Sequence, residues 1–343
     1  MPPKSLRILT VDAQYEDDGV VERATAGDGY DFEIWRRREG VVVSNESFAA
    51  ADALLVWHQL VVDADVIAKL KRCRFISRAG VGYDHIDLEA AGARGIPVCY
   101  VPDYGTSEVA DHAIALWLAL RRGIVNYNEQ LREDVIANFH WSNAKTIRRV
   151  RGTRFGIVGL GRIGTATALR AKAFGCEVVA YDPYLPRGQE IAVGVRRAES
   201  LENLLSECDC VSLHVPLTAE TRNMINVSTL ACIQPHAVLV NTSRGAVIDL
   251  DALYETLRAG KIAGVGLDVL PQEPPDPQHP LFQAYHQQLD WVLGRLVLTP
   301  HGAWYSAESQ HDARRLAVEN IISFFERGEL RNCVNKEYLR GTT

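Results

Sequence analysis

The sequence predicts an α/β protein with two parallel-sheet domains, one inserted into the other. Short apolar, β-branched segments alternate with helix-like segments along most of the chain, which is typical of parallel sheets covered by helices. A glycine-rich strand–turn–helix pattern begins only at Phe155, so a separate α/β unit precedes it. The last helix-like stretch, residues 306–327, is predicted to return to that first unit.

The composition is that of a globular protein. A length of 343 residues is enough for two hydrophobic cores. A net charge of −6 and the lack of a basic block argue against a nucleic-acid surface. Seven cysteines without framework spacing favour free thiols in a reducing compartment. With no secretory segment and no apolar run of membrane-spanning length, we expect a cytoplasmic protein that binds neither membrane nor nucleic acid.

The first unit contains strand-like segments and no phosphate-binding loop. The predicted strands are residues 6–11, 32–36, 53–57, 75–77 and 97–100. Helix-like stretches lie between them, at 64–71 and 87–95. Residues 78–84 form a glycine turn at the carboxyl end of a strand, where backbone N–H groups are suited to a carboxylate. A plain tight turn explains the same residues equally well.

A long apolar helix is predicted for residues 107–121, after a linker at 101–103. Its run AIALWLAL is apolar nearly all round, so we expect the helix to be buried between domains or subunits. The more polar residues 124–150 are predicted to form an exposed helix and a connector.

The glycine cluster after the predicted strand at 155–158 has the spacing G-x-G-x-x-G. Gly159 allows the tight turn into the next helix, Gly161 lets backbone N–H groups approach a pyrophosphate, and Gly164 lets the helix lie close to the strand. The N-terminus of that helix offers unpaired N–H groups and the positive end of its dipole. In this context a dinucleotide site is favoured over a glycine-rich structural turn.

Asp182 indicates which dinucleotide binds. It follows the predicted strand at 177–181, eighteen residues after Gly164. A carboxylate at this position can accept hydrogen bonds from ribose hydroxyls and would repel a 2′-phosphate. NAD is therefore favoured over NADP.

Polar residues follow strand-like segments in the second half of the chain, where open α/β sheets keep their ligands. The predicted strands there are 210–215, 237–241, 263–268 and 296–299. Arg244 and His301 follow two of these strands, and Glu273 lies in a Pro-rich turn after a third. Taken one at a time, these residues are most simply a strand cap, a structural histidine and a solvated charge. Their coincidence beside a dinucleotide site favours a function.

The three residue types are suited to reducing an α-keto acid. Arginine can bind a carboxylate through two parallel hydrogen bonds. Histidine can exchange a proton with a carbonyl oxygen near neutral pH. A carboxylate behind the histidine orients the ring and raises its pKa. A nicotinamide would supply the hydride.

The chain resembles the D-isomer-specific 2-hydroxyacid dehydrogenases from about Leu6 to Val334. The matching segments are AGVGYDHID, VGLGRIG, NTSRGAVID, GLDVLPQEP and LTPHGAW. Within the family the chain is most similar to the C-terminal-binding-protein branch, on the segments RAKAFG, YDPYLP, HGAWYS and LRNCVNKEYL. We therefore expect two Rossmann-like parallel-sheet domains, with an NAD-binding domain at 103–305 inserted into a discontinuous, flavodoxin-like substrate domain at 1–102 and 306–343.

The resemblance also implies roles for individual residues. Arg244 would hold the substrate carboxylate, and Glu273 would pair with His301 as the acid/base. The substrate side would be lined by Arg78, Val81, Gly82 and Trp304. The cofactor, NAD(H) without a metal, would contact Thr106, Gly159, Leu160, Gly161, Arg162, Ile163, Gly164, Asp182, Val215, Pro216, Thr221, Thr242, Ser243, Asp268, His301 and Gly302. The partners implied are a small 2-oxo or 2-hydroxy acid and a second copy of the chain, bound through the helix at 107–121 and its surroundings. Trp304 as a pocket wall would suit an apolar or thioether tail, although core packing explains it equally well.

The chain departs from the family pattern in two places. His85 stands where the family usually has asparagine. Extra residues around QAYHQQLDW lengthen the gap between Glu273 and His301, and we expect a surface excursion near the cleft.

Two alternatives stay open beside the reduction of a 2-oxo acid. One is a dimeric, NADH-sensing binding protein or corepressor with slow turnover, as in the C-terminal-binding-protein branch. The other is a dehydrogenase of a related acid such as formate, phosphite or a phosphonate. Glu273 argues against formate, because formate dehydrogenases of this superfamily have a glutamine beside the histidine.

Overall fold

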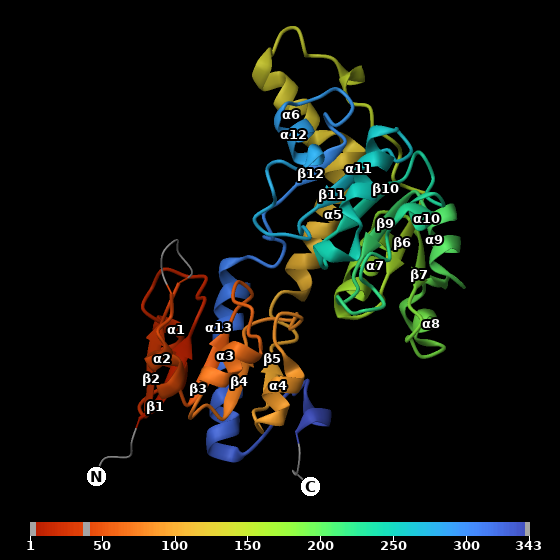
Figure 1. Ribbon diagram of the computed structural model, residues 1–343. Coiled ribbons are helices and arrows are strands. Elements are labelled where there is room, and N and C mark those ends of the chain that lie inside the picture. The colour runs from red at the N-terminus through yellow and green to blue at the C-terminus, as the bar shows by residue number, and fades with distance from the viewer. Residues whose placement is uncertain (1–4, 37–41, 340–343) are drawn as a thin grey trace. The chain divides into compact units, whose positions relative to one another are not determined.

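The computed structural model describes residues 5–36 and 42–339, which divide into two compact units (Figure 1). Unit 1 comprises Met1–Gly105 and Tyr305–Thr343, and unit 2 comprises Thr106–Trp304. The chain therefore leaves unit 1 once, builds unit 2 and returns. The expected inserted domain, 103–305, begins three residues before unit 2 and ends one residue after it.

Unit 1 is built on a five-stranded sheet in the order β2-β1-β3-β4-β5. The strands are β1 (Leu6–Thr10), β2 (Tyr30–Ile34), β3 (Ala53–Val56), β4 (Phe75–Arg78) and β5 (Val98–Tyr100). All neighbours run parallel. This is the strand order of flavodoxin-like sheets, with the topological switch point between β1 and β3. The fold class expected for the outer domain is confirmed.

Helices cover this sheet, and every residue of β3 and β4 is buried. The helices are α1 (Val20–Ala26), α2 (Asn45–Ala50), α3 (Ala64–Lys69), α4 (Leu88–Ala93) and α13 (Ala307–Arg327). Side-chain oxygens of Ser44, Asp63, Asp87 and Ser306 cap four of them by accepting backbone N–H groups. The return of α13, predicted from the sequence, is confirmed: Phe324 stacks on Phe75 of β4, with ring centroids 4.7 Å apart.

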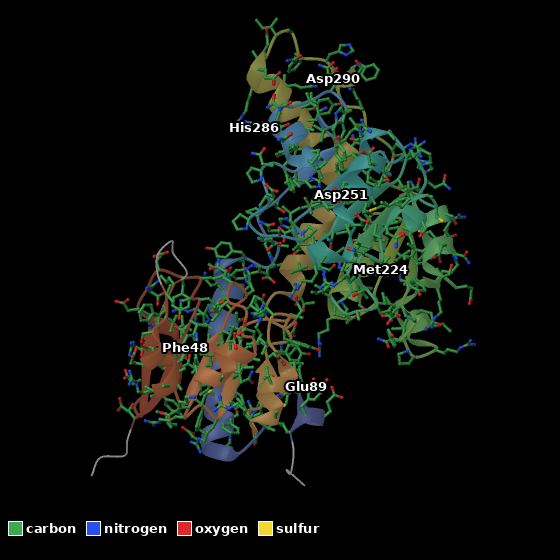
Figure 2. The ribbon with its side chains drawn as sticks, in the orientation of Figure 1. Phe48, Glu89, Met224, Asp251, His286 and Asp290 are labelled. Carbon is green, nitrogen blue, oxygen red and sulfur yellow. The ribbon has the colours of Figure 1, made fainter. Side chains whose placement is uncertain are left out.

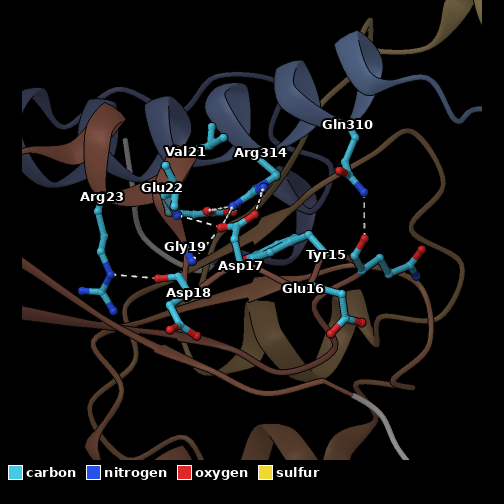
Figure 3. Close-up of polar contacts among 12 residues, drawn as sticks. Tyr15, Glu16, Asp17, Asp18, Gly19, Val21, Glu22, Arg23, Gln310 and Arg314 are labelled. Atoms are coloured by element: carbon cyan, nitrogen blue, oxygen red, sulfur yellow. Dashed lines mark hydrogen bonds and ion pairs between the residues drawn. The ribbon is translucent and has the colours of Figure 1, made fainter.

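Arg314 fastens α13 to the segment after β1 (Figure 3). Its guanidinium donates to Asp17 at 2.7 Å and to Glu22 at 2.6–2.8 Å, and lies 3.6 Å from the centroid of the Tyr15 ring. Glu22 is fully buried, and Arg314 is the cation that pairs with its carboxylate. The hydrogen bonds of Arg314, together with backbone N–H groups, lower the pKa of Asp17 to about 2 despite partial burial. Residues near opposite ends of the sequence thus form one polar cluster.

Unit 2 is built on a seven-stranded sheet in the order β12-β11-β10-β9-β6-β7-β8. The strands are β6 (Arg154–Val158), β7 (Glu177–Tyr181), β8 (Arg196–Arg197), β9 (Cys210–Leu213), β10 (Val238–Asn241), β11 (Gly264–Leu267) and β12 (Leu296–Leu298). All neighbours are parallel, and the order reverses between β6 and β9. This is the Rossmann-type order with one added strand, which confirms the fold expected for the inserted domain.

Two helices of unit 2 precede β6 in the sequence, and the others lie between its strands. The helices are α5 (Thr106–Arg122), α6 (Ile124–Glu133), α7 (Arg162–Ala173), α8 (Gln189–Val193), α9 (Leu201–Glu207), α10 (Val227–Leu230), α11 (Leu250–Arg258) and α12 (Pro280–His286). The apolar helix expected at 107–121 is α5, and it packs on α7, β10 and β11. Trp117 is buried edge-on against Phe155, at 4.9 Å between ring centroids. Asp111 and Ala115, on another side of α5, are exposed in the single chain, so the burial expected between subunits stays a prediction for that side.

The extra residues before His301, 283–291, form the end of α12 and the turns that lead to β12. Residues 285–290 are exposed, so this segment lies on the surface of unit 2 as expected; Figure 2 labels His286 and Asp290 within it. The residues that flank it are packed: Leu281 and Val292 are buried in the core of unit 2. The Trp291 ring contacts the Tyr254 ring of α11, with centroids 5.8 Å apart, and Pro280 in the first turn fits the start of α12.

None of the helices in the described ranges is long and apolar enough to cross a membrane.

Candidate functional site

The glycine turn connects β6 to α7 and has the geometry of a phosphate-binding turn. Gly159 has φ 91°, and a Cβ there would lie 2.7 Å from the His214 carbonyl oxygen. A Cβ on Gly164 would clash with the Gly159 carbonyl, so glycine lets α7 approach β6. Open space surrounds Gly161, the residue that precedes the first turn of α7. These residues fit a dinucleotide pyrophosphate over the helix N-terminus.

Asp182 lies beside this turn. One oxygen of its carboxylate accepts the N–H of Leu160 at 3.0 Å, and the other accepts the N–H of Tyr184 at 3.0 Å. Its side chain is thus held where the acid of a dinucleotide site lies, at the end of the strand next to the turn. The sequence placed Asp182 at a strand end; the link to Leu160 is visible only in the structure.

Other expected cofactor residues follow β9 and β10. Val215 and Pro216 come after β9, and the Thr221 hydroxyl donates to the Pro216 carbonyl at 2.6 Å. Thr242 and Ser243 come after β10. The Thr242 hydroxyl is buried and has no hydrogen-bond partner within the described residues. A buried hydroxyl without a protein partner fits a site that a bound polar group completes.

Asp268 organises the turn that carries His301. It is buried, and its carboxylate accepts the N–H groups of Gly302 at 2.9 Å and Ala303 at 3.0 Å, and the Thr299 hydroxyl at 2.6 Å. Its backbone carbonyl accepts the His301 N–H at 2.8 Å. The sequence marked Asp268 as a cofactor contact; the structure shows it holding the polypeptide around the histidine.

His301 and Glu273 form a pair. The His301 Nδ1 lies 2.6 Å from a Glu273 carboxylate oxygen, and the other oxygen accepts the Leu270 N–H at 2.9 Å. Partial burial raises the pKa of Glu273, but the hydrogen bond and charge of His301, the Leu270 N–H and the charge of Arg244 bring it below its ordinary value. The glutamate is therefore an ionised partner that orients the imidazole through Nδ1.

Arg244 is held in a tight turn after β10. The Asn241 amide donates to the Arg244 carbonyl at 2.9 Å and accepts the Ser243 N–H at 3.0 Å. A Cβ on Gly245 would clash with the Leu270 backbone, so this turn lies directly against the segment that leads to Glu273. The structure thus brings Arg244, Glu273 and His301 together at the carboxyl edge of one sheet, as the sequence suggested.

The remaining expected residues are placed as follows. Arg78, Val81 and Gly82 belong to unit 1, where β4 ends. Arg78 is buried and donates hydrogen bonds to the Gly82 carbonyl at 2.6 Å and to the Ala79 carbonyl. These hydrogen bonds stabilise the glycine turn that follows β4. Thr106 and Trp304 are the first and last residues of unit 2.

Asp12 was not foreseen. It is fully buried at the end of β1, and its carboxylate accepts the N–H groups of Trp57, Gln59 and Leu60 at 2.7–3.0 Å. Burial raises its pKa, against these hydrogen bonds and the charge of Arg78. The only signal in the sequence is an acid directly after a predicted strand. Across the described ranges no three His, Cys, Asp or Glu side chains are grouped to hold a metal ion.

Comparisons with known proteins agree with this geometry. The family model described as D-isomer specific 2-hydroxyacid dehydrogenase, NAD binding domain, matches residues 114–303. The chain is 41% identical over 281 residues to a glyoxylate reductase of Korarchaeum cryptofilum, covering 81% of each sequence. It is 36% identical over 285 residues to a D-3-phosphoglycerate dehydrogenase of Archaeoglobus fulgidus, covering 83% of this chain but only 51% of that relative, so it spans about half of the relative's length.

One similar solved structure is the NADPH-dependent glyoxylate/hydroxypyruvate reductase of Sinorhizobium meliloti, in complex with NADP and malonate. It superposes with a TM-score of 0.83 at 28% identity, over 99% of this chain and 100% of that one. The similarity therefore extends over both units.

Proposed function

Because the chain belongs to the family of D-isomer-specific 2-hydroxyacid dehydrogenases, we propose that it reduces a small 2-oxo acid to the D-2-hydroxy acid with NADH, and catalyses the reverse oxidation. The observation that carries this proposal is the pair His301–Glu273, 2.6 Å apart, beside Arg244 on the sheet that bears the glycine turn. An oriented histidine, an arginine and a dinucleotide turn on one sheet are the parts that such a reaction needs.

Each residue has a task in this reaction. Arg244 binds the substrate carboxylate and so fixes the carbonyl carbon in place. His301 gives its Nε2 proton to the carbonyl oxygen, because its Nδ1 faces Glu273. Glu273 keeps the ring in this orientation and stabilises the protonated form. The nicotinamide supplies the hydride.

The proposed cofactor residues surround the glycine turn. The N-terminus of α7 would hold the pyrophosphate, and the Asp182 carboxylate would accept hydrogen bonds from the ribose hydroxyls. The buried Thr242 hydroxyl would form a hydrogen bond with the cofactor. Asp182 favours NAD, because a 2′-phosphate would meet its negative charge.

The substrate side is proposed to be completed by Arg78, Val81, Gly82 and Trp304. The activities of the similar reductases put glyoxylate and hydroxypyruvate first among candidate substrates. Trp304 would accept a larger apolar tail.

We also propose a homodimer formed through the α5–α6 region. The segment after α6 exposes Ile136, Phe139 and Trp141 to 88%, 79% and 80%. Large apolar side chains gathered on one exposed segment are typical of a subunit interface. The free thiols expected in a reducing compartment support a cytoplasmic location.

The test is NADH oxidation, followed by absorbance, against glyoxylate, pyruvate, hydroxypyruvate, phenylpyruvate and 4-methylthio-2-oxobutyrate. We expect rapid turnover of at least one acid and, where the 2-hydroxy acid is chiral, oxidation of the D-isomer but not of the L-isomer. His301→Gln is the matched control and should bind NADH without turnover. NADH binding by the wild-type protein without turnover of any acid would refute the proposal and favour the binding-protein alternative.

A further inference from the structure

The C-terminal segment after α13 runs along the open edge of the unit 1 sheet. β5 is the last strand of that sheet. The Val334 N–H donates to the Val98 carbonyl at 2.9 Å, and the Tyr100 N–H donates to the Asn332 carbonyl at 3.3 Å. Between these two hydrogen bonds, Cys99 and Cys333 are antiparallel partners. The segment thus covers an edge that would otherwise present unpaired backbone groups.

This pairing brings two cysteines directly opposite each other. Because the hydrogen bonds join the residues on either side, Cys99 and Cys333 form a non-hydrogen-bonded pair, the type in which Cα atoms approach to about 4.5 Å. Side chains of such a pair lie on the same face of the sheet. Disulfides span Cα separations of roughly 4.4–6.8 Å, so these two sulfurs can bond while the backbone stays in place.

The two thiols differ in exposure and acidity. Cys99 is fully buried, whereas Cys333 is half-buried. A hydrogen bond from the Cys99 thiol is the largest cause that lowers the pKa of Cys333 to about 6; partial burial opposes it, and the backbone N–H of Asn335 and the charge of Lys336 add to it. In its protonated form the Cys333 thiol donates to the side-chain oxygen of Asn335 at 3.4 Å. The same interaction and burial raise the pKa of Cys99. Because Cys333 is the thiol that solvent can reach and Cys99 is buried, Cys333 is the nucleophile of the pair and Cys99 is the resolving thiol; the direction of the two pKa shifts agrees with this order.

We propose that Cys333 and Cys99 are an oxidation site that closes into a reversible disulfide between β5 and the C-terminal segment. The Cys333 thiolate attacks one oxygen of hydrogen peroxide, the O–O bond breaks, and a sulfenic acid and hydroxide form; the hydroxide takes up the proton that the Cys333 thiol had released and becomes water. The Cys99 sulfur then attacks the Cys333 sulfur, the S–O bond breaks, and the sulfenic oxygen leaves as water with the Cys99 proton. Both sulfurs are oxidised and the peroxide is reduced to two equivalents of water. A small dithiol reverses the reaction.

The disulfide would join the two pieces from which unit 1 is made. Cys99 lies in the first piece and Cys333 in the second, so the covalent loop includes the whole of unit 2. Asn335 already holds the segment, since its amide donates to the Ile96 carbonyl at 3.0 Å and accepts the Val98 N–H at 2.8 Å. Oxidation would add a covalent bond to the hydrogen bonds that hold this segment against β5. A crosslink over such a long loop strongly restricts the unfolded chain.

The other five cysteines offer an internal control. Cys73, Cys176, Cys208 and Cys210 are buried, and Cys232 after α10 is the other half-buried thiol. Cys232 has a hydrogen bond to the Ser228 carbonyl and belongs to unit 2. Its rate of oxidation therefore serves as the reference for a half-buried thiol that has no cysteine opposite it.

The test uses the full chain, treated with limiting hydrogen peroxide and measured by intact mass and by mapping of unreduced peptides. We expect the loss of two hydrogen atoms, one crosslinked peptide pair that contains Cys99 and Cys333, full reversal by dithiothreitol, and a higher urea midpoint for the oxidised form. Cys232→Ser should behave as the wild type.

Two variants separate the steps. Cys333→Ser should remove the mass loss. Cys99→Ser keeps a hydroxyl that can donate to Cys333 and should gain one oxygen at Cys333, trapped by dimedone as a sulfenic acid. The proposal is overturned if the wild type gains oxygen without the Cys99–Cys333 crosslink, if the crosslink joins other cysteines, or if Cys232 is oxidised while the pair stays reduced.

Discussion

His301 has an unusual backbone conformation, and Asp268 maintains it. Its φ of 54° is left-handed, a conformation that residues with a side chain rarely adopt. The Asp268 carbonyl accepts the His301 N–H, and its buried carboxylate accepts the next two N–H groups. Because these hydrogen bonds fix the backbone of His301 and of the next two residues, they hold the imidazole in place to contact Glu273. The proposed acid/base residue is thus positioned by a neighbouring strand end.

Arg244→Lys tests the carboxylate site. A lysine keeps the charge but loses the bidentate fork, so kcat/KM for the best 2-oxo acid should fall about 100-fold or more, while the Kd for NADH stays within about two-fold. Steady-state kinetics and NADH fluorescence measure the two quantities. Arg258→Lys, on the exposed side of α11 and paired with Glu255, is the matched control and should leave kcat/KM unchanged. Full activity of Arg244→Lys would exclude it as the carboxylate site.

Glu273→Gln tests the histidine partner. The pKa of Glu273 lies below its ordinary value, so glutamine removes a negative charge that faces the His301 Nδ1 at 2.6 Å. We expect kcat for reduction to fall about 10- to 100-fold and its decline with rising pH to begin at lower pH. Asp251→Asn removes the carboxylate of a surface pair with His279, 3.2 Å apart, and should not move the profile. An unshifted profile for Glu273→Gln would contradict the pairing.

Asp182→Ala tests the choice of cofactor. Removing the carboxylate should lower the ratio of kcat/KM for NADH to that for NADPH about 10-fold or more, because the 2′-phosphate no longer meets a negative charge. Asp182→Asn separates charge from structure, since it retains an acceptor for the Leu160 N–H. It should relax the preference as much as alanine does. If neither variant changes the ratio, Asp182 does not select NAD.

At the scale of elements, the attachment of α13 depends on one buried charge cluster. Arg314→Met would leave the fully buried Glu22 without its partner, which should cost about 3–5 kcal/mol in the free energy of unfolding measured with urea. Arg315→Met breaks a surface pair with Glu319 and should cost at most about 0.5 kcal/mol. Equal effects of the two changes would refute a special role for Arg314. Adding Glu22→Gln to Arg314→Met should recover part of the loss.

The same cluster predicts a dependence on pH. The pKa of Asp17 falls from its ordinary 3.8 to about 2 in the folded protein, so its ionisation contributes stability that is complete above about pH 4 and is lost as the pH falls toward 2. Unfolding midpoints measured from pH 5 to pH 2 should decline for the wild type, and the decline should be smaller for Asp17→Asn. Parallel curves for the two proteins would contradict this account.

At the scale of the whole molecule, a single charged substitution tests the proposed dimer interface. Ile136→Asp places a carboxylate on the exposed apolar segment after α6, and it should convert the proposed dimer to a monomer of half the mass by sedimentation velocity. Val227→Asp, at another exposed apolar residue, should leave the mass unchanged. A wild-type monomer, or a dimer that survives Ile136→Asp, would reject this interface.

The sequence by itself determined the fold class and the chemistry of the strand ends. Alternating apolar segments and helix-like stretches predicted two parallel sheets, because these periodicities are local. The glycine spacing and Asp182 predicted the turn that the structure contains. Arg244, Glu273 and His301 were found because parallel strands place their carboxyl ends on one edge, so residues after different strands are brought together by topology alone.

Only the tertiary structure decided which distant residues are partners. Arg314 meets Glu22 across 292 positions, Asp12 binds the backbone of residues 57–60, Asp182 holds the Leu160 N–H, and Cys333 lies opposite Cys99. The extra segment before His301 lies at the surface as expected, but only the structure shows that the buried Leu281 and Val292 hold its two ends in the core of unit 2. Local patterns fix which way a residue faces within its own element. Its partner depends on how elements far apart in the sequence come to lie together, and no short-range pattern records that.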